Sequence, residues 1–96
     1  MPHDKTAAGQ LLRFVADEYA ELGRWDDAVR TYVEVTELGG PAVGLAGMDG
    51  GRIARDELND PVTAHALFRA ACVAGNDPAC REVARTRTRR LRRASR

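Results

Sequence analysis

Two cysteines are the residues of this sequence whose side chains could react with each other. Cys72 and Cys80 lie eight positions apart, on either side of a Gly75-Asn76 turn signal between two expected helices. Helices joined by a short turn run antiparallel, so we expect the two thiols to lie close together. Either a disulfide or a pair of reduced thiols, packed as small hydrophobic groups, fits that proximity. We expect reduced thiols, because the first residues lack the apolar run of an export signal and the cytoplasm keeps cysteines reduced.

A metal site would need more donors than these cysteines supply. His65 precedes Cys72 by seven residues, which is about 10.5 Å along a helix, whereas a tetrahedral zinc site needs four nearby nitrogen or sulfur ligands. We therefore expect no metal and no cofactor.

The polar residues do not form a recognisable catalytic pattern. The single serine, Ser95, lies at the end of the sequence, which argues against a serine triad. The glycines of residues 47–51 do not connect a strand to a helix, as a phosphate-binding loop requires. The acidic residues fall mostly on polar helix faces, where solvation is their usual role. We expect a protein that is not an enzyme.

Charge is distributed unevenly along the chain. Residues 85–96 hold seven arginines and no acid, whereas residues 1–84 hold eight basic and fourteen acidic groups. The arginine-rich end could be solvated or paired with the acidic part of the chain, could bind carboxylates of a protein partner, or could bind nucleic-acid phosphates. The arginines that we expect to make such contacts are Arg85, Arg89, Arg92 and Arg93.

The elements that must position these residues are helices. The 96-residue chain is 44% hydrophobic, its alanine, leucine, glutamate and arginine favour helix, and no stretch alternates as a strand would. The sequence contains no run of eighteen apolar residues, which is the length that a membrane-spanning helix needs. Apolar spacing and Gly/Pro punctuation predict helices over residues 6–22, 25–38, 42–55, 61–74 and from residue 77 onward.

Three details of these helices are open to test. Asp60 and Asp77 are the expected N-caps of the last two helices. The glycine-rich segment 42–55 is expected to be helical only where packing supports it, or to break at Gly50-Gly51. The last helix is expected to fray among its arginines.

The helices repeat. A shift of 36 residues places Leu22 on Leu58, Ala28 on Ala64, Tyr32 on Phe68, Val35 on Ala71 and Gly39 on Gly75. Both copies keep the order leucine, alanine, aromatic, small apolar residue, glycine. The sequence therefore predicts an all-α, short α-solenoid of two helix-turn-helix repeats in residues 1–84, followed by a capping helix that ends in residues 85–96.

These positions resemble two related families of helical repeats. The likeness to the second half of a tetratricopeptide repeat rests on Tyr19, Leu22, Gly23, Trp25, Ala28, Tyr32 and Val35. The likeness to the Sel-one-like variant, whose period suits the shift of 36, rests on Asp60, Ala64, Leu67, Phe68, Ala71, Cys72, Gly75 and Ala79. The resemblance covers residues 9–84, although segment 42–55 offers glycines where a leucine-glycine pair and an aromatic residue are typical.

The resemblance implies a scaffold that binds a partner protein or peptide in the concave groove of stacked helices. The lack of an export signal favours the cytoplasm, and the preference for arginine over lysine, with many alanines and glycines, suggests a bacterial source. Nucleic-acid association through the arginine-rich end is the alternative function. The groove residues implied by the tetratricopeptide register are Gln10, Arg13, Asp17 and Glu21.

The resemblance also bears on the cysteines and on assembly. In the cysteine-rich, secreted branch of the Sel-one-like family, cysteines at the spacing of Cys72 and Cys80 form a disulfide. About three repeat units are usually needed for a stable stack. Either the fifth helix completes the two units found here, or a second copy of the chain does.

Overall fold

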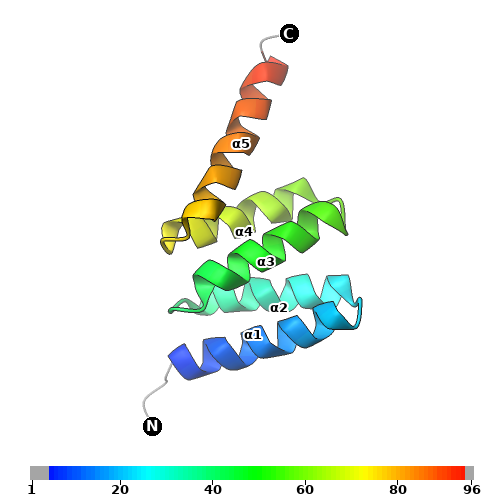
Figure 1. The fold of residues 1–96 in the computed structure, drawn as a ribbon, viewed down its shortest axis with the longest axis vertical. Helices are drawn as coiled ribbons and strands as arrows, with labels where there is room; N and C mark the ends of the chain where they lie inside the picture. Colours follow the sequence, from blue (N-terminus) through cyan, green and yellow to red (C-terminus); the bar gives the residue numbers. More distant parts are fainter. Residues whose placement is uncertain (1–4, 95–96) are drawn as a thin grey trace.

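The computed structural model describes residues 5–94 as five α-helices joined by short turns. The helices are α1 (Lys5–Glu21), α2 (Trp25–Leu38), α3 (Val43–Asp56), α4 (Pro61–Val73) and α5 (Asp77–Ala94). Each helix packs mainly on its neighbour in sequence, and Figure 1 shows α1 to α4 stacked side by side. The described residues contain no strand. The predicted all-α fold of two helix-turn-helix repeats and a closing helix is confirmed.

The turns use the residues that the repeat pattern singled out. Gly39 and Gly75, which the 36-residue shift superposes, have positive φ values of 83° and 97°, a conformation that glycine adopts without steric cost. Asp60 caps α4 as predicted, because its carboxylate accepts hydrogen bonds from the Thr63 hydroxyl at 2.6 Å and the Thr63 backbone N–H at 3.1 Å. For the first helix the sequence favours Asp4 or Thr6 as N-cap; Asp4 lies outside the described residues, and Thr6 lies inside α1, which begins at Lys5.

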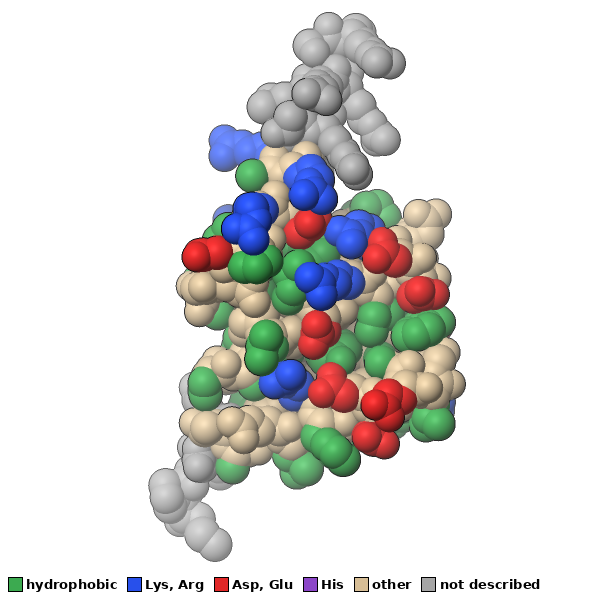
Figure 2. Space-filling model, viewed as in Figure 1, with side chains coloured by type: hydrophobic (Ala, Val, Ile, Leu, Met, Phe, Trp, Pro, Cys, Tyr) green, Lys and Arg blue, Asp and Glu red, His purple; other side chains and the backbone are tan. Residues whose placement is uncertain are grey.

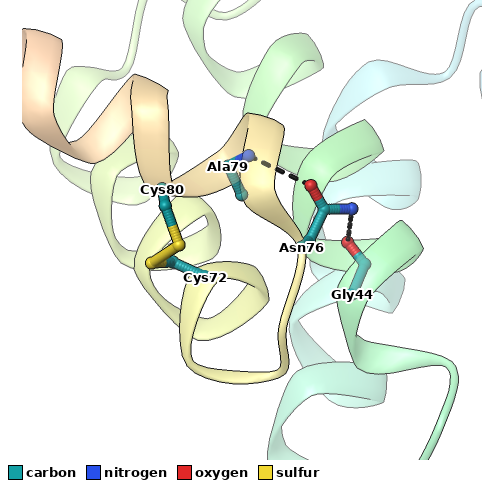
Figure 3. The surroundings of a disulfide bond; sticks show 5 residues. All are labelled: Gly44, Cys72, Asn76, Ala79 and Cys80. Atoms are coloured by element: carbon teal, nitrogen blue, oxygen red, sulfur yellow. Dashed lines mark hydrogen bonds between the residues drawn. A yellow bond between two sulfur atoms is a disulfide. The ribbon is translucent and has the colours of Figure 1, made fainter.

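The start of α5 differs from the prediction. Asn76, not Asp77, is its N-cap: Oδ1 of Asn76 accepts a hydrogen bond from the backbone N–H of Ala79 at 3.0 Å. The Nδ2 atom of Asn76 donates to the carbonyl oxygen of Gly44 in α3 at 3.2 Å (Figure 3). An amide can accept and donate at once, whereas an ionised carboxylate can only accept. Asn76 therefore caps α5 and also ties it to α3.

The core consists largely of small residues. One apolar cluster joins α1, α2 and α3, and a second joins α2 to α5, so α3 contributes to both. Tyr32 and Phe68, the aromatic pair of the repeat, are each 2% exposed and belong to the first and the second cluster respectively. The predicted equivalence of these two sheltered rings is confirmed.

Helix α3 is continuous through its glycines, and the predicted alternative of a break at Gly50-Gly51 is wrong. A Cβ atom on Gly47 would lie 2.5 Å from the carbonyl oxygen of Leu67, and one on Gly51 would lie 2.5 Å from the Phe68 ring. These glycines therefore allow α4 to approach the α3 backbone. The burial gained there offsets a helix-propensity cost of up to about 1 kcal/mol per glycine.

Candidate partner-binding surfaces

The predicted groove residues lie on α1, which shares the near side of Figure 1 with α3. Gln10 and Glu21 are exposed, whereas Arg13 and Asp17 are half-buried. Asp17 accepts a hydrogen bond from the hydroxyl of buried Tyr32, which comes from α2. The two central residues are thus partly engaged within the fold, and the two outer ones face solvent.

Two residues of α3 belong to the same surface, although sequence analysis did not select them. Asp49 is half-buried, and its pKa is raised by burial first and by the Asp17 carboxylate second, against the opposing effect of Arg13 and Arg52. The 36-residue shift superposes Asp49 on Arg13 and could have identified it. We call this surface the α1–α3 face, made of Gln10, Arg13, Asp17, Glu21, Asp49 and Arg52.

One charge of the α1–α3 face, the Asp17 carboxylate, is held in place by a hydrogen bond. Burial raises the pKa of the Tyr32 hydroxyl well above its ordinary value, and the hydrogen bond to Asp17 with the charges of Asp17 and Asp49 raises it further. The hydroxyl therefore remains a donor and orients Asp17. The Nε atom of Arg13 is buried without a hydrogen-bond partner among the described residues, and no described residue donates a hydrogen bond to Asp49.

Replacing Asp49 by asparagine is expected to stabilise the protein at neutral pH. Because the fold raises the pKa of Asp49, its contribution to stability is present below the ordinary carboxyl pKa and is lost as the pH rises through the raised value. Asp49→Asn should therefore raise the free energy of unfolding at pH 7 by about 0.5 kcal/mol, a small effect because solvent screens a half-exposed group. Urea unfolding at pH 7 and at about pH 3 measures the difference.

Asp60 supplies the opposite control. Hydrogen bonds from the Thr63 side chain and backbone lower its pKa, so Asp60 adds stability above the ordinary carboxyl pKa and loses it as the pH falls. Asp60→Ala should accordingly lower the free energy of unfolding at pH 7, and should lower it much less at low pH. If Asp49→Asn still raised the free energy of unfolding at about pH 3, the stabilisation would come from better packing of the amide and not from removal of the charge.

A second surface is a cleft between α4 and α5, two helices whose directions diverge in Figure 1. It encloses about 860 Å³ and is lined by residues of α3, α4 and α5. The Arg55 guanidinium lies 5.5 Å from the centroid of the Phe68 ring and 2.8 Å from the Glu82 carboxylate. Glu82 also pairs with Arg85 at 3.1 Å. Arg55 thereby links α3 to α5 across the cleft.

The two cysteines meet beside the turn that joins α4 to α5. Cys72 and Cys80 form a disulfide with a Cα–Cα distance of 4.6 Å (Figure 3). Their predicted proximity is confirmed, whereas the reduced thiols that we expected are not what the structure contains. No group of three or more His, Cys, Asp or Glu side chains could hold a metal ion in the part of the chain that the structure describes.

The arginines for which we predicted contacts lie along α5. This helix continues to Ala94, whereas we expected it to fray among its arginines. Arg85 is exposed and pairs with Glu82, as above. The side chains of Arg89, Arg92 and Arg93 lie outside the described ones, although their backbone belongs to α5.

A third surface is an exposed apolar stripe on α1, at the end of the stack. Leu11, Phe14 and Leu22 are 65%, 60% and 71% exposed, and Val15 lies beside them. Leu11, Phe14 and Val15 lie three and four residues apart along α1, so they share one side. Leu22 directly follows the end of α1, seven residues after Val15. Contiguous exposed apolar residues of this kind mark interaction sites.

Comparison with known proteins gives no family for this chain. None of the described helices is long and apolar enough to cross a membrane. The likeness to tetratricopeptide and Sel-one-like repeats stays a prediction. Comparisons of the chain with models of known protein families, with curated proteins and with solved structures found no match.

Proposed function

We propose that this protein is an interaction scaffold that binds a segment of a partner protein on the α1–α3 face. The observation that carries the proposal is Asp49, a half-buried carboxylate with a raised pKa and no hydrogen bond from a described residue. Such a group costs stability, and costly charges are typically retained where function needs them. A donor on a bound partner would supply the missing hydrogen bond.

The chemistry of the face suggests a partner segment with basic residues. Asp17, Glu21 and Asp49 supply three carboxylates on two adjacent helices, and Figure 2 shows acidic side chains gathered toward the α1 and α2 end of this side. Because the carboxylates project from helices, little ordering is needed on binding, which favours affinity. Arg13 and Arg52 would in turn donate hydrogen bonds to an acidic or carbonyl group of the segment.

Two further predictions belong with this proposal. The described residues contain no arrangement that would add catalysis to binding, and we continue to expect a protein that is not an enzyme. The cytoplasmic location also stays a prediction. The disulfide argues against it, because disulfides persist mainly in oxidising compartments.

Selection of peptides from a displayed random library on the purified protein tests the proposal. Wild-type protein should enrich related sequences that contain lysine or arginine. Asp49→Asn should weaken their binding about tenfold, as expected for loss of one charged hydrogen bond. Since this variant is also expected to be more stable than wild type, weaker binding could not be attributed to unfolding.

Glu34→Gln is the matched control, because it removes one exposed carboxylate from α2 with the same change of charge. It should leave the affinity of the selected peptides unchanged. Selection of no related sequences, or equal binding by wild type and Asp49→Asn, would show that the α1–α3 face is not the binding surface.

A further inference from the structure

Helix α5 is held in a direction that takes its arginines away from the acidic part of the same molecule. Three interactions hold the N-terminal part of α5 in place: the Cys72–Cys80 disulfide, the hydrogen bonds of Asn76, and the Arg55–Glu82 ion pair. α5 then continues to Ala94 beyond the stack, and Figure 1 shows it at the opposite end from α1. As far as Ala94, the α5 helix therefore runs away from α1 of its own chain.

The exposed charge of α5 is positive. Arg81, Arg85 and Arg87 are all exposed. Glu82 is the one acidic residue of the sequence after Asp77, and Arg55 and Arg85 already neutralise it. The helical period places positions 81, 85, 89 and 92 on one side of α5. That side of the helix presents a row of four arginine positions.

The other end of the molecule carries the complementary features. The apolar stripe of α1, formed by Leu11, Phe14, Val15 and Leu22, is exposed, and no described residue covers it. Glu18 falls within the stripe by helical register, Glu21 borders it, and both are exposed. The long arginine side chain can lay its methylene groups on apolar surface while its guanidinium group reaches a carboxylate.

We propose that the α1 stripe of one copy of this chain binds the arginine side of α5 of a second copy. The two complementary surfaces lie at opposite ends of one chain and cannot meet within it, so the nearest match for each is on another copy. Nucleic acid would engage the arginines but leave the apolar stripe of α1 exposed. A contact between two copies covers the apolar stripe of one and the arginine side of the other.

The contact is heterologous, because it joins different surfaces of the two copies. A pair of bound copies still presents one free stripe at one end and one free α5 at the other, so assembly continues beyond the dimer unless the rotation closes a ring. The α1–α3 face lies to one side of the stripe and shares Glu21 with its border. Asp49→Asn changes the α1–α3 face alone, and Arg81→Glu with Arg89→Glu changes α5 alone, so peptide binding and self-association can fail independently in these variants.

Reversing the charges of each surface in turn, in the full, oxidised chain, tests the proposal. Glu18→Arg with Glu21→Arg reverses the α1 charges, and Arg81→Glu with Arg89→Glu reverses two α5 charges. Sedimentation velocity should show that the molecular mass of the wild type increases with protein concentration at about 20 mM salt. At about 300 mM salt, where exposed charges are screened, the mass at the same protein concentration should be lower. Each double variant alone should associate about tenfold more weakly. An equimolar mixture of the two should recover association, because each reversed surface then meets its complement.

Glu34→Arg with Glu37→Arg is the control, since it makes the same change in net charge on exposed positions of α2 and should associate as wild type does. Wild-type protein that remains monomeric at every concentration overturns the proposal. So does a mixture that stays monomeric while circular dichroism shows both variants folded. Duplex DNA that binds a monomeric wild type and is released by Arg81→Glu with Arg89→Glu would assign α5 to nucleic acid instead.

Discussion

Gly47→Ala is expected to lower the free energy of unfolding by about 3 kcal/mol, the upper part of the range for overpacking a core. The added Cβ would lie 2.5 Å from the carbonyl oxygen of Leu67 and 2.8 Å from the Cβ of Ala71. Both neighbours are fixed to the α4 backbone, so no side-chain rotation can relieve the contact. A loss of this size is a large share of the stability of a small domain. Thermal unfolding, followed by circular dichroism, measures it.

Gly44→Ala is the matched control within the same helix. The nearest atom to its Cβ would be the Cβ of Asn76 at 3.7 Å, an ordinary van der Waals distance. Alanine there should stabilise by up to about 1 kcal/mol through helix propensity. Equal stability of the Gly47 and Gly44 variants would show that α3 and α4 are not packed as closely as the structure describes.

The pairing of helices could be predicted from the sequence because the repeat is local and ordered. Tyr32 and Phe68 occupy matching positions along α2 and α4, and both are buried against neighbouring helices. The role of the glycines in α3 could not be predicted in the same way. A glycine lowers helix propensity wherever it occurs, and only the facing atoms of Leu67 and Phe68 show that a Cβ would not fit at Gly47 or Gly51.

The candidate site was predicted in part. The tetratricopeptide register selected Arg13 and Asp17, whereas Asp49 was not selected, because its burial depends on neighbouring helices. The choice between Asn76 and Asp77 as N-cap depends on the carbonyl of Gly44, which lies 32 residues away in sequence. The spacing of the cysteines predicted their proximity, but their oxidation state was inferred from compartment, which no residue encodes.

Removing the disulfide with Cys72→Ala and Cys80→Ala is expected to lower the free energy of unfolding by about 2–3 kcal/mol. That is the chain-entropy value for a loop as short as the eight-residue separation of the cysteines. The loss should be concentrated in α5, which packs mainly on α4, whereas α3 packs on helices at both sides. Hydrogen exchange should therefore show α5 amides losing protection while α3 amides keep theirs.

The reduced wild-type protein separates the covalent bond from the change of side chain. If the bond itself holds α5, reduction of wild-type protein should increase exchange in α5 as the double variant does, and reductant should have no further effect on the variant. Asn76→Ala tests the hydrogen bonds of Asn76, since it removes both the one that Asn76 accepts from the Ala79 backbone N–H and the one that it donates to the Gly44 carbonyl oxygen. In the double-cysteine background it should release α5 further. Unchanged α5 protection after reduction would mean that Asn76 and the Arg55–Glu82 pair suffice to hold the helix, and the direction of α5 would then be independent of redox conditions.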